Sequence, residues 1–198
     1  MIVIEHQRSC GLGRFGPWLA AAGLEPTVVR PYLGDPVPAR ADDGLIVLGG
    51  EASAWQDERC PWLPATRELI ARSVADGVPT LGICLGAQLM TLACGGVVEP
   101  GGHGLEAGVV PVDPLPAAAG DPLLGHLSAG TPAVQFHYDV SVTLPPGAVL
   151  LATGAVYPNQ AYRLGRAAWA VQFHPEATTE IFRGWLANDA GNLTARGL

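Results

Sequence analysis

Two stretches of the sequence carry residues that can perform covalent chemistry together. In the first, Cys84 stands between two glycines in Gly82-Ile83-Cys84-Leu85-Gly86, after a short apolar run and before a helical pattern. Such a strand-to-helix turn presents its central residue at the carboxyl end of a strand, where the unpaired N–H groups of the helix favour a thiolate over a thiol. The stretch therefore predicts a reactive cysteine.

The second stretch places a histidine and a carboxylate at the end of an apolar strand. It reads Trp169-Ala170-Val171-Gln172-Phe173-His174-Pro175-Glu176, and Pro175 both interrupts strand pairing and favours an extended His174. Glu176 is close enough along the chain to reach one ring nitrogen of His174. These residue types form a triad for acyl transfer, in which a thiolate attacks a carbonyl, an imidazolium protonates the leaving amine and a carboxylate orients the imidazole.

Acyl transfer also requires donors for the oxyanion that develops on the attacked carbonyl. The backbone N–H of Leu85, directly after the cysteine, is one candidate. The Gly49-Gly50 turn follows the apolar run at residues 45–48 and supplies the other, with Gly50 as the donor. Glu51 comes next, and its carboxylate would oppose the developing charge unless it points away or recognises an amine of the substrate.

These motifs, in this order and at this spacing, resemble those of the class I (triad) glutamine amidotransferase family. The resemblance is closest to stand-alone members similar to the glutaminase domain of GMP synthase. It implies that Cys84 attacks the γ-amide of glutamine, releases ammonia and forms a γ-glutamyl thioester that water hydrolyses to glutamate, with His174 and Glu176 completing the triad. The resemblance also implies a set of substrate-binding residues: Gly49, Gln88, His137, Tyr138 and Asp139.

Two positions in the expected substrate pocket depart from the family pattern. In Gln135-Phe136-His137-Tyr138-Asp139, Tyr138 replaces the usual glycine, and Glu51 replaces a proline or another uncharged residue. We expect Tyr138 to narrow the pocket or to force a different backbone path, because tyrosine resists φ values that glycine adopts. We expect Glu51 to modify the pocket. Both departures leave open whether the substrate is free glutamine or a γ-glutamyl conjugate.

Three functions remain compatible with these residues. The first is a glutaminase-type amidotransferase that supplies ammonia to an acceptor synthetase in trans. The second is a lone hydrolase of γ-glutamyl amides or peptides that uses the same triad. The third is a non-catalytic regulatory or binding subunit with the same fold, and the intact Cys84, His174 and Glu176 argue against it.

Composition and charge exclude several other classes of protein. The 198 residues are 48% hydrophobic and 15% charged, which is typical of a soluble globular protein. The net charge of −7, without a basic cluster, argues against binding of nucleic acid or of anionic membranes. Neither a membrane-spanning stretch nor a signal peptide is recognisable, and four cysteines without a Cys-x-x-Cys pair suit the cytoplasm. We expect neither a cofactor nor a metal, and we expect Cys10 to be a free thiol in a loop.

The order of the expected elements indicates an α/β fold. Apolar runs at 1–5, 26–29, 45–48 and 79–83 alternate with helical patterns, which predicts a three-layer, mostly parallel sheet flanked by helices, with a nucleophile elbow at Cys84. The second half has short strands between Pro/Gly turns and predicts an antiparallel extension, followed by a helix at 177–188. We expect residues 1–189 to form one domain and residues 190–198 to be a frayed C-terminal tail.

Overall fold

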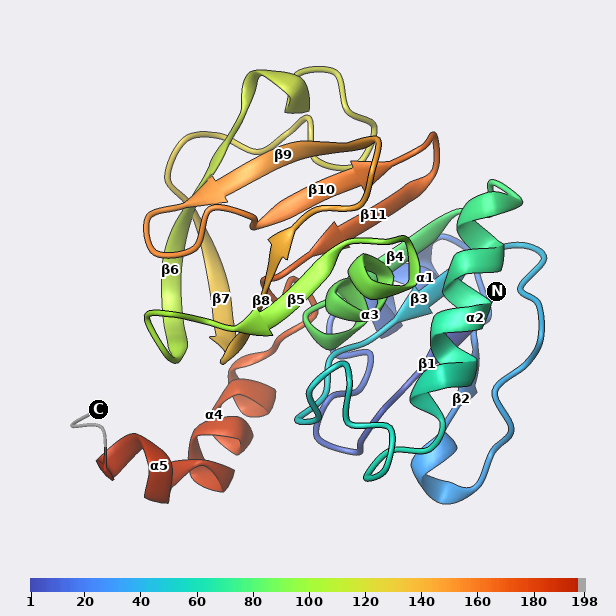
Figure 1. Ribbon diagram of the computed structural model, residues 1–198, viewed down its shortest axis with the longest axis horizontal. Helices are drawn as coiled ribbons and strands as arrows, with labels where there is room; N and C mark the ends of the chain where they lie inside the picture. Colours follow the sequence, from blue (N-terminus) through green and yellow to red (C-terminus); the bar gives the residue numbers. More distant parts are fainter. Residues whose placement is uncertain (196–198) are drawn as a thin grey trace.

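The computed structural model, which describes residues 1–195, is organised around a nine-stranded sheet with the strand order β2-β1-β3-β4-β11-β10-β9-β6-β7 (Figure 1). Pairing is parallel from β2 to β11. This part consists of β1 (Ile2–Ile4), β2 (Thr27–Val29), β3 (Leu45–Val47), β4 (Thr80–Ile83) and β11 (Ala168–Val171). Strands β3, β4 and β11 are almost completely buried, because helices cover both faces of a parallel sheet.

From β11 onward the pairing is antiparallel, which confirms the predicted α/β class with an extension in the second half. This part consists of β10 (Ala161–Leu164), β9 (Ala148–Gly154), β6 (Glu106–Pro114) and β7 (Thr131–His137). Buried and less buried residues alternate along β7, as expected where one face of a sheet is covered. A separate two-stranded sheet pairs β5 (Val97–Pro100) with β8 (Asp139–Thr143).

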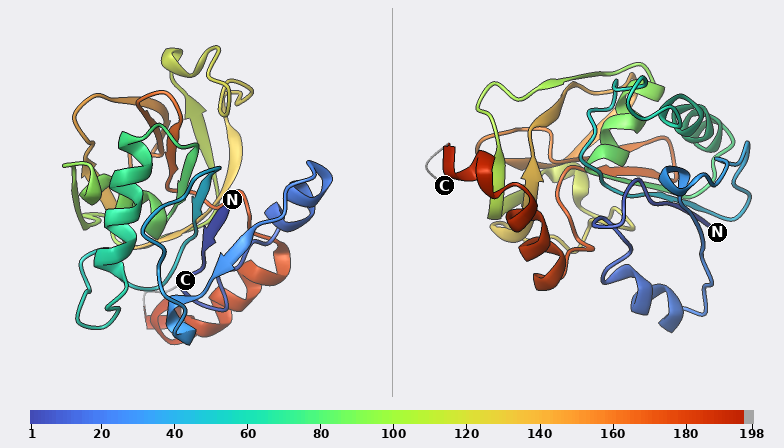
Figure 2. Two further views of the ribbon diagram at one scale, coloured as in Figure 1. Left: turned by 90° about the vertical axis from the view of Figure 1, so that its right-hand side faces the viewer. Right: turned by 90° about the horizontal axis from the view of Figure 1, so that it is seen from below.

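Helices lie on both faces of the sheet, so the fold has three layers. Figure 2 shows α2 (Leu63–Ala75) and α3 (Leu85–Ala93) on one side, and α1 (Phe15–Ala21) and α4 (Thr179–Asn188) on the other. Neighbouring residues of β1 serve opposite cores: Ile4 packs with the α2 and α3 side, and Val3 packs with the α1 side. Two short 3-10 helices, Pro31–Leu33 and Pro116–Ala118, lie in connections.

The turn from β4 into α3 has the strained geometry that the glycine spacing predicts. Cys84 precedes α3 with φ 49° and ψ −107°, and it is the one non-glycine residue between 1 and 195 with a positive φ. A Cβ on Gly82 would lie 2.6 Å from the carbonyl oxygen of Gly86, and a Cβ on Gly86 would collide with the carbonyl oxygen of Val47. Both glycines therefore allow the backbone to approach closely around the cysteine.

The C-terminal region differs from the expected helix and frayed tail. Helix α4 begins at Thr179, because the hydroxyl of Thr178 accepts a hydrogen bond from the N–H of Ile181 and caps it. Residues 190–195 form a further helix, α5 (Ala190–Ala195), in which the side chain of Leu193 is buried. Burial of this apolar side chain gives the segment a reason to be ordered. The rest of the predicted tail, residues 196–198, lies outside the described residues.

No helix among the described residues is both long and apolar enough to cross a bilayer.

Candidate active site

The parallel sheet brings the cysteine and the histidine of the two sequence motifs to one edge. Strands β4 and β11 are neighbours, with Ile83 opposite Val171, so Cys84 and His174 both emerge at their carboxyl ends. The N–H of Cys84 donates to the carbonyl of Val171 at 2.9 Å. Gly49 lies next to both side chains, because a Cβ at this position would be 3.0 Å from Cε1 of His174 and 3.5 Å from Cβ of Cys84.

His174 and Glu176 form a buried pair. Nδ1 of His174 lies 2.7 Å from Oε1 of Glu176, and the two side chains are 3% and 1% exposed. Burial alone lowers the pKa of His174, but attraction to the negative charges of Cys84 and Glu176, together with the hydrogen bond to Glu176, outweighs it and raises the pKa to about 10. These interactions therefore favour the imidazolium over the neutral ring. Its other nitrogen, Nε2, is buried and lies toward Cys84. Polar contact with that side chain also raises this pKa, although no hydrogen bond of regular geometry forms at Nε2 within residues 1–195.

The two expected oxyanion donors lie next to each other. A Cβ on Gly50 would be 2.9 Å from Cδ2 of Leu85, so the turn after β3 packs directly against the start of α3. Within residues 1–195, the N–H groups of Gly50 and Leu85 donate no hydrogen bond to a backbone carbonyl. Both groups thus remain available at the cysteine.

Glu51 is exposed at the rim of the site and is held by a residue that the sequence did not single out. The side-chain amide of Gln7 donates to Oε1 of Glu51 at 3.2 Å, and the N–H of Glu51 donates to Oε1 of Gln7 at 2.9 Å. This double contact fixes the loop that carries Gly50. Gln7 follows β1, and its polar side chain in a loop gave no sequence signal for this role.

The segment from His137 to Asp139 meets Gln88 and α4. Nε2 of Gln88 donates to the carbonyl of Asp139 at 2.8 Å, and the hydroxyl of Tyr138 donates to Oδ2 of Asp189 at 2.6 Å. Tyr138 does not have a positive φ, so its backbone is one that tyrosine adopts without strain. Its side chain reaches the end of α4.

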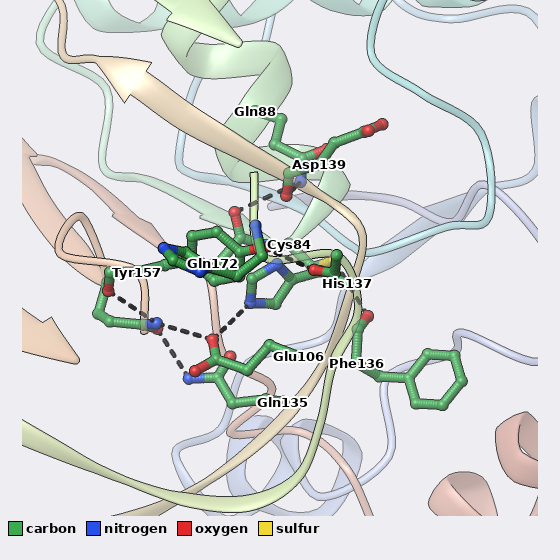
Figure 3. A network of polar contacts seen from close by, with 12 residues as sticks. Cys84, Gln88, Glu106, Gln135, Phe136, His137, Asp139, Tyr157 and Gln172 are labelled. Atoms are coloured by element: carbon green, nitrogen blue, oxygen red, sulfur yellow. Dashed lines mark hydrogen bonds and ion pairs between the residues drawn. The ribbon is translucent and has the colours of Figure 1, made fainter. Parts of the chain in front are cut away.

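His137 is fixed by a buried polar network (Figure 3). Its Nε2 lies 2.9 Å from Oε2 of Glu106, with both side chains at most 3% exposed, while its Nδ1 has no hydrogen bond within the described part of the chain. Nε2 of Gln160 also donates to Glu106 at 3.1 Å, and Nε2 of Gln135 donates to Gln160 at 2.8 Å. Sequence reasoning did not find Glu106 or Gln160. Glu106 begins β6 and Gln160 precedes β10, and the order of residues along the chain does not indicate that both lie beside the end of β7.

A cavity of about 690 Å³ opens above the cysteine. Most residues predicted for the site line it: Gly50, Glu51, Cys84, Gln88, His137, Tyr138, Asp139 and His174. Gly49, Leu85 and Glu176 are not among the residues that line it. The cavity also includes residues that the sequence did not assign to the site: Gln7, Cys10, Ser53, Arg59, Trp185, Asn188 and Asp189.

Cys10, expected as a loop thiol, is buried at the cavity, and burial raises its pKa, so it is a neutral thiol. Among the described residues, no group of three or more His, Cys, Asp or Glu side chains is arranged to hold a metal ion.

Comparison with known proteins identifies the family. Residues 19–190 match the family model described as glutamine amidotransferase class-I. The chain belongs to the class-I glutamine amidotransferase family. A solved structure of a glutamine amidotransferase from Methylobacillus flagellatus, 33% identical, superimposes with a TM-score of 0.86 and covers 96% of this chain and 75% of its own.

Proteins that are similar in sequence to this chain carry names that indicate different activities. A glutamine amidotransferase-like protein, YfeJ, of Salmonella typhimurium is 29% identical over 96% of this chain and 81% of its own length. A GMP synthase [glutamine-hydrolyzing] of Parasynechococcus marenigrum is 36% identical over 67% of this chain, and the match covers 24% of that synthase. A gamma-glutamyl-L-1-hydroxyisopropylamide hydrolase of a Pseudomonas species is 29% identical over 81% of this chain and 56% of its own length. The chain thus spans about a quarter of the GMP synthase that it matches.

Proposed function

We propose that this protein hydrolyses the γ-amide of glutamine through a γ-glutamyl thioester on Cys84. One observation carries the proposal: the strained Cys84 and His174, which is paired with the buried Glu176, both emerge at the carboxyl ends of β4 and β11 and both line a large cavity. Membership of the class-I glutamine amidotransferase family supports the same reaction.

In the first half of the reaction, the thiolate of Cys84 attacks the γ-carbonyl carbon. The oxyanion accepts hydrogen bonds from the N–H groups of Leu85 and Gly50, which have no backbone acceptor of their own within residues 1–195. Nε2–H of His174 donates its proton to the amide nitrogen, the C–N bond breaks, and ammonia leaves. Glu176 holds Nδ1–H of the ring at 2.7 Å, which keeps Nε2 directed to the leaving group.

In the second half, the neutral His174 removes a proton from water, and the hydroxide attacks the thioester. The C–S bond then breaks, glutamate leaves, and the thiolate and the imidazolium are restored. The substrate's amino and carboxyl groups are assigned to the side of the cavity made by Gln88 and residues 137–139, and to the neighbouring Gly49. Nε2 of Gln88 already donates to the carbonyl of Asp139, so this contact sets the position of that side.

We assign the ammonia to an acceptor synthetase subunit that binds in trans in the cytoplasm. The similarity to a glutamine-hydrolysing GMP synthase supports this assignment, since the match there covers 24% of a longer chain. Four free cysteines, Cys10, Cys60, Cys84 and Cys94, also favour a reducing compartment.

The test is the release of glutamate from glutamine by the purified protein and by two matched cysteine variants. Cys84→Ala removes the nucleophile and should abolish release. Cys94→Ala removes a partly buried cysteine at the far end of α3 and should retain it. Equal activity of the two variants would contradict the proposed nucleophile.

A second candidate is hydrolysis of γ-glutamyl amides whose leaving group is larger than ammonia. The cavity of about 690 Å³ suits a ligand well above the size of one amino acid. Arg59 lines this cavity and forms no ion pair with any residue from 1 to 195, so it can bind a carboxylate on the leaving group. The relative that hydrolyses a γ-glutamyl hydroxyisopropylamide supports this reaction class.

A substrate panel separates the two candidates. Glutamine, a γ-glutamyl alkylamide and a γ-glutamyl amino acid should be compared by kcat/KM, together with Arg59→Gln. A preference for the γ-glutamyl amino acid that Arg59→Gln abolishes supports the second candidate. A preference for glutamine that Arg59→Gln leaves unchanged supports the first.

A further inference from the structure

Helix α4 contributes an aromatic ring that lies directly against the histidine of the active site. The ring centroids of Trp185 and His174 are 4.5 Å apart, with an angle of 55° between the ring planes. Trp185 is 5% exposed and lines the cavity above Cys84. The proposed reaction uses Cys84, His174 and Glu176 and gives no role to this indole.

The indole is held on several sides and has little freedom to move. Its Nε1–H donates to the carbonyl of Ser9 at 2.8 Å, which ties α4 to the loop after β1. Phe136 and Phe182 pack against it, with ring centroids at 6.0 and 6.2 Å. A side chain fixed in this way can set the position of the smaller ring beside it.

The contact also distinguishes the two charge states of His174. An aromatic face carries negative potential and attracts a cation within about 6 Å, most strongly when the pair is removed from water. His174 is buried with a side chain that is 3% exposed, so the indole favours the imidazolium over the neutral ring. The imidazolium is the form that must protonate the leaving amine.

We infer that Trp185 is a positioning residue that stabilises the protonated His174 and holds its ring in line with the reacting groups. This inference rests on the proposed role of His174 as the proton donor. The other titratable groups around the cavity are Cys10, Glu51, Arg59, His137, Asp139 and Asp189, in addition to Cys84 and Glu176. Burial raises the pKa of Cys10, which keeps that thiol neutral and leaves Cys84 and Glu176 as the charges closest to the ring.

A pair of substitutions isolates the contribution of the aromatic face. Trp185→Phe and Trp185→Leu both lose the hydrogen bond to Ser9 and both keep the position apolar, but only phenylalanine retains an aromatic ring. The pKa of His174 can be followed by NMR through its ring Cε1–H, assigned by the signal that His174→Gln removes. We expect this pKa to fall by about 0.5 to 1 in Trp185→Leu and to fall much less in Trp185→Phe.

The control is Trp18→Leu, which removes a half-exposed indole on α1 whose ring contact is with Phe15, and which should leave the pKa unchanged. If circular dichroism shows that Trp185→Leu is unfolded, Trp185→Met takes its place. An unchanged pKa in the folded leucine or methionine variant would overturn the inference, and so would equal shifts in the leucine and phenylalanine variants.

The NMR titration requires no substrate, so its result is independent of which amide the protein hydrolyses. If the protein turns over glutamine, the alkaline limb of kcat/KM against pH should move down with the NMR value in Trp185→Leu. A shifted NMR pKa without any turnover would support the role of Trp185 and contradict the proposed function. Turnover of glutamine with an unshifted pKa of His174 would support the proposed function and contradict the role of Trp185.

Discussion

Two parts of the cavity are held in place by different kinds of interaction. The floor consists of Cys84 and His174, and the α4 wall consists of Trp185 and Asp189 together with Tyr138, which contacts Asp189. Cys84 and His174 on the floor follow two paired parallel strands, so backbone hydrogen bonds bring them together. The wall depends on single side-chain contacts, such as the hydrogen bond from Tyr138 to Asp189 and the contact of Trp185 with His174. The position of Cys84 and His174 is therefore set by the sheet, whereas the shape of the pocket can change with one side chain.

If the floor depends on close backbone approach, adding one methyl group there should have the largest effect. The Cβ in Gly86→Ala would collide with the carbonyl of Val47, and we expect the free energy of unfolding to fall by about 3 kcal/mol. Gly184→Ala is the matched control in α4, where a Cβ meets nothing within 4 Å, and it should raise that free energy by about 0.5–1 kcal/mol. Chemical denaturation measures both, and similar destabilisation in the two helices would break the comparison.

Replacement of Glu176, the carboxylate that pairs with His174, should affect the reaction rate and leave the fold intact. Glu176→Gln keeps the shape of the side chain but removes the charge that stabilises the imidazolium, so we expect kcat to fall about 10²–10⁴-fold with circular dichroism unchanged. Glu180→Gln, an exposed carboxylate in the first turn of α4, should leave kcat unchanged. An unchanged rate in Glu176→Gln would remove this residue from the triad.

A substitution in the α4 wall should have a smaller effect than one in the triad, and it should change KM in place of kcat. Tyr138→Phe removes the hydroxyl that donates to Asp189 at 2.6 Å, and the loss of one hydrogen bond corresponds to about 1 kcal/mol. We expect a rise in KM of about fivefold with little change in kcat, because the triad is untouched. A fall in kcat of the same size as in Glu176→Gln would show that the wall and the floor are not separate.

The same difference explains which parts of the molecule were predictable from the sequence. The floor follows from local rules: glycines around Cys84 indicate a tight turn, apolar runs indicate strands, and parallel strands end at one edge. These rules also predicted the α/β class with an antiparallel extension, which the structure and the family confirm. The assignment of Cys84, His174 and Glu176 as a triad remains a prediction.

The wall could not be predicted, because its contacts join residues far apart in the chain. Trp185 occupies a helical position typical of any core residue, and only the packing of α4 shows that it meets His174. Glu106 gives no sequence sign that it will be buried beside His137. The hydrogen bond from Tyr138 to Asp189 also had no sign in the sequence, because the two residues are far apart in the chain.

The role of Cys84 as the nucleophile is tested most directly by covalent labelling with an electrophilic analogue of glutamine, such as its chloroketone, followed by peptide mapping. The protein has three other cysteines, Cys10, Cys60 and Cys94, which serve as internal controls. We predict that Cys84 alone is labelled, that excess glutamine or γ-glutamyl amide slows the labelling, and that Cys84→Ala prevents it. Labelling that is spread over the other cysteines, or that persists in Cys84→Ala, would contradict the assignment of Cys84 as the nucleophile.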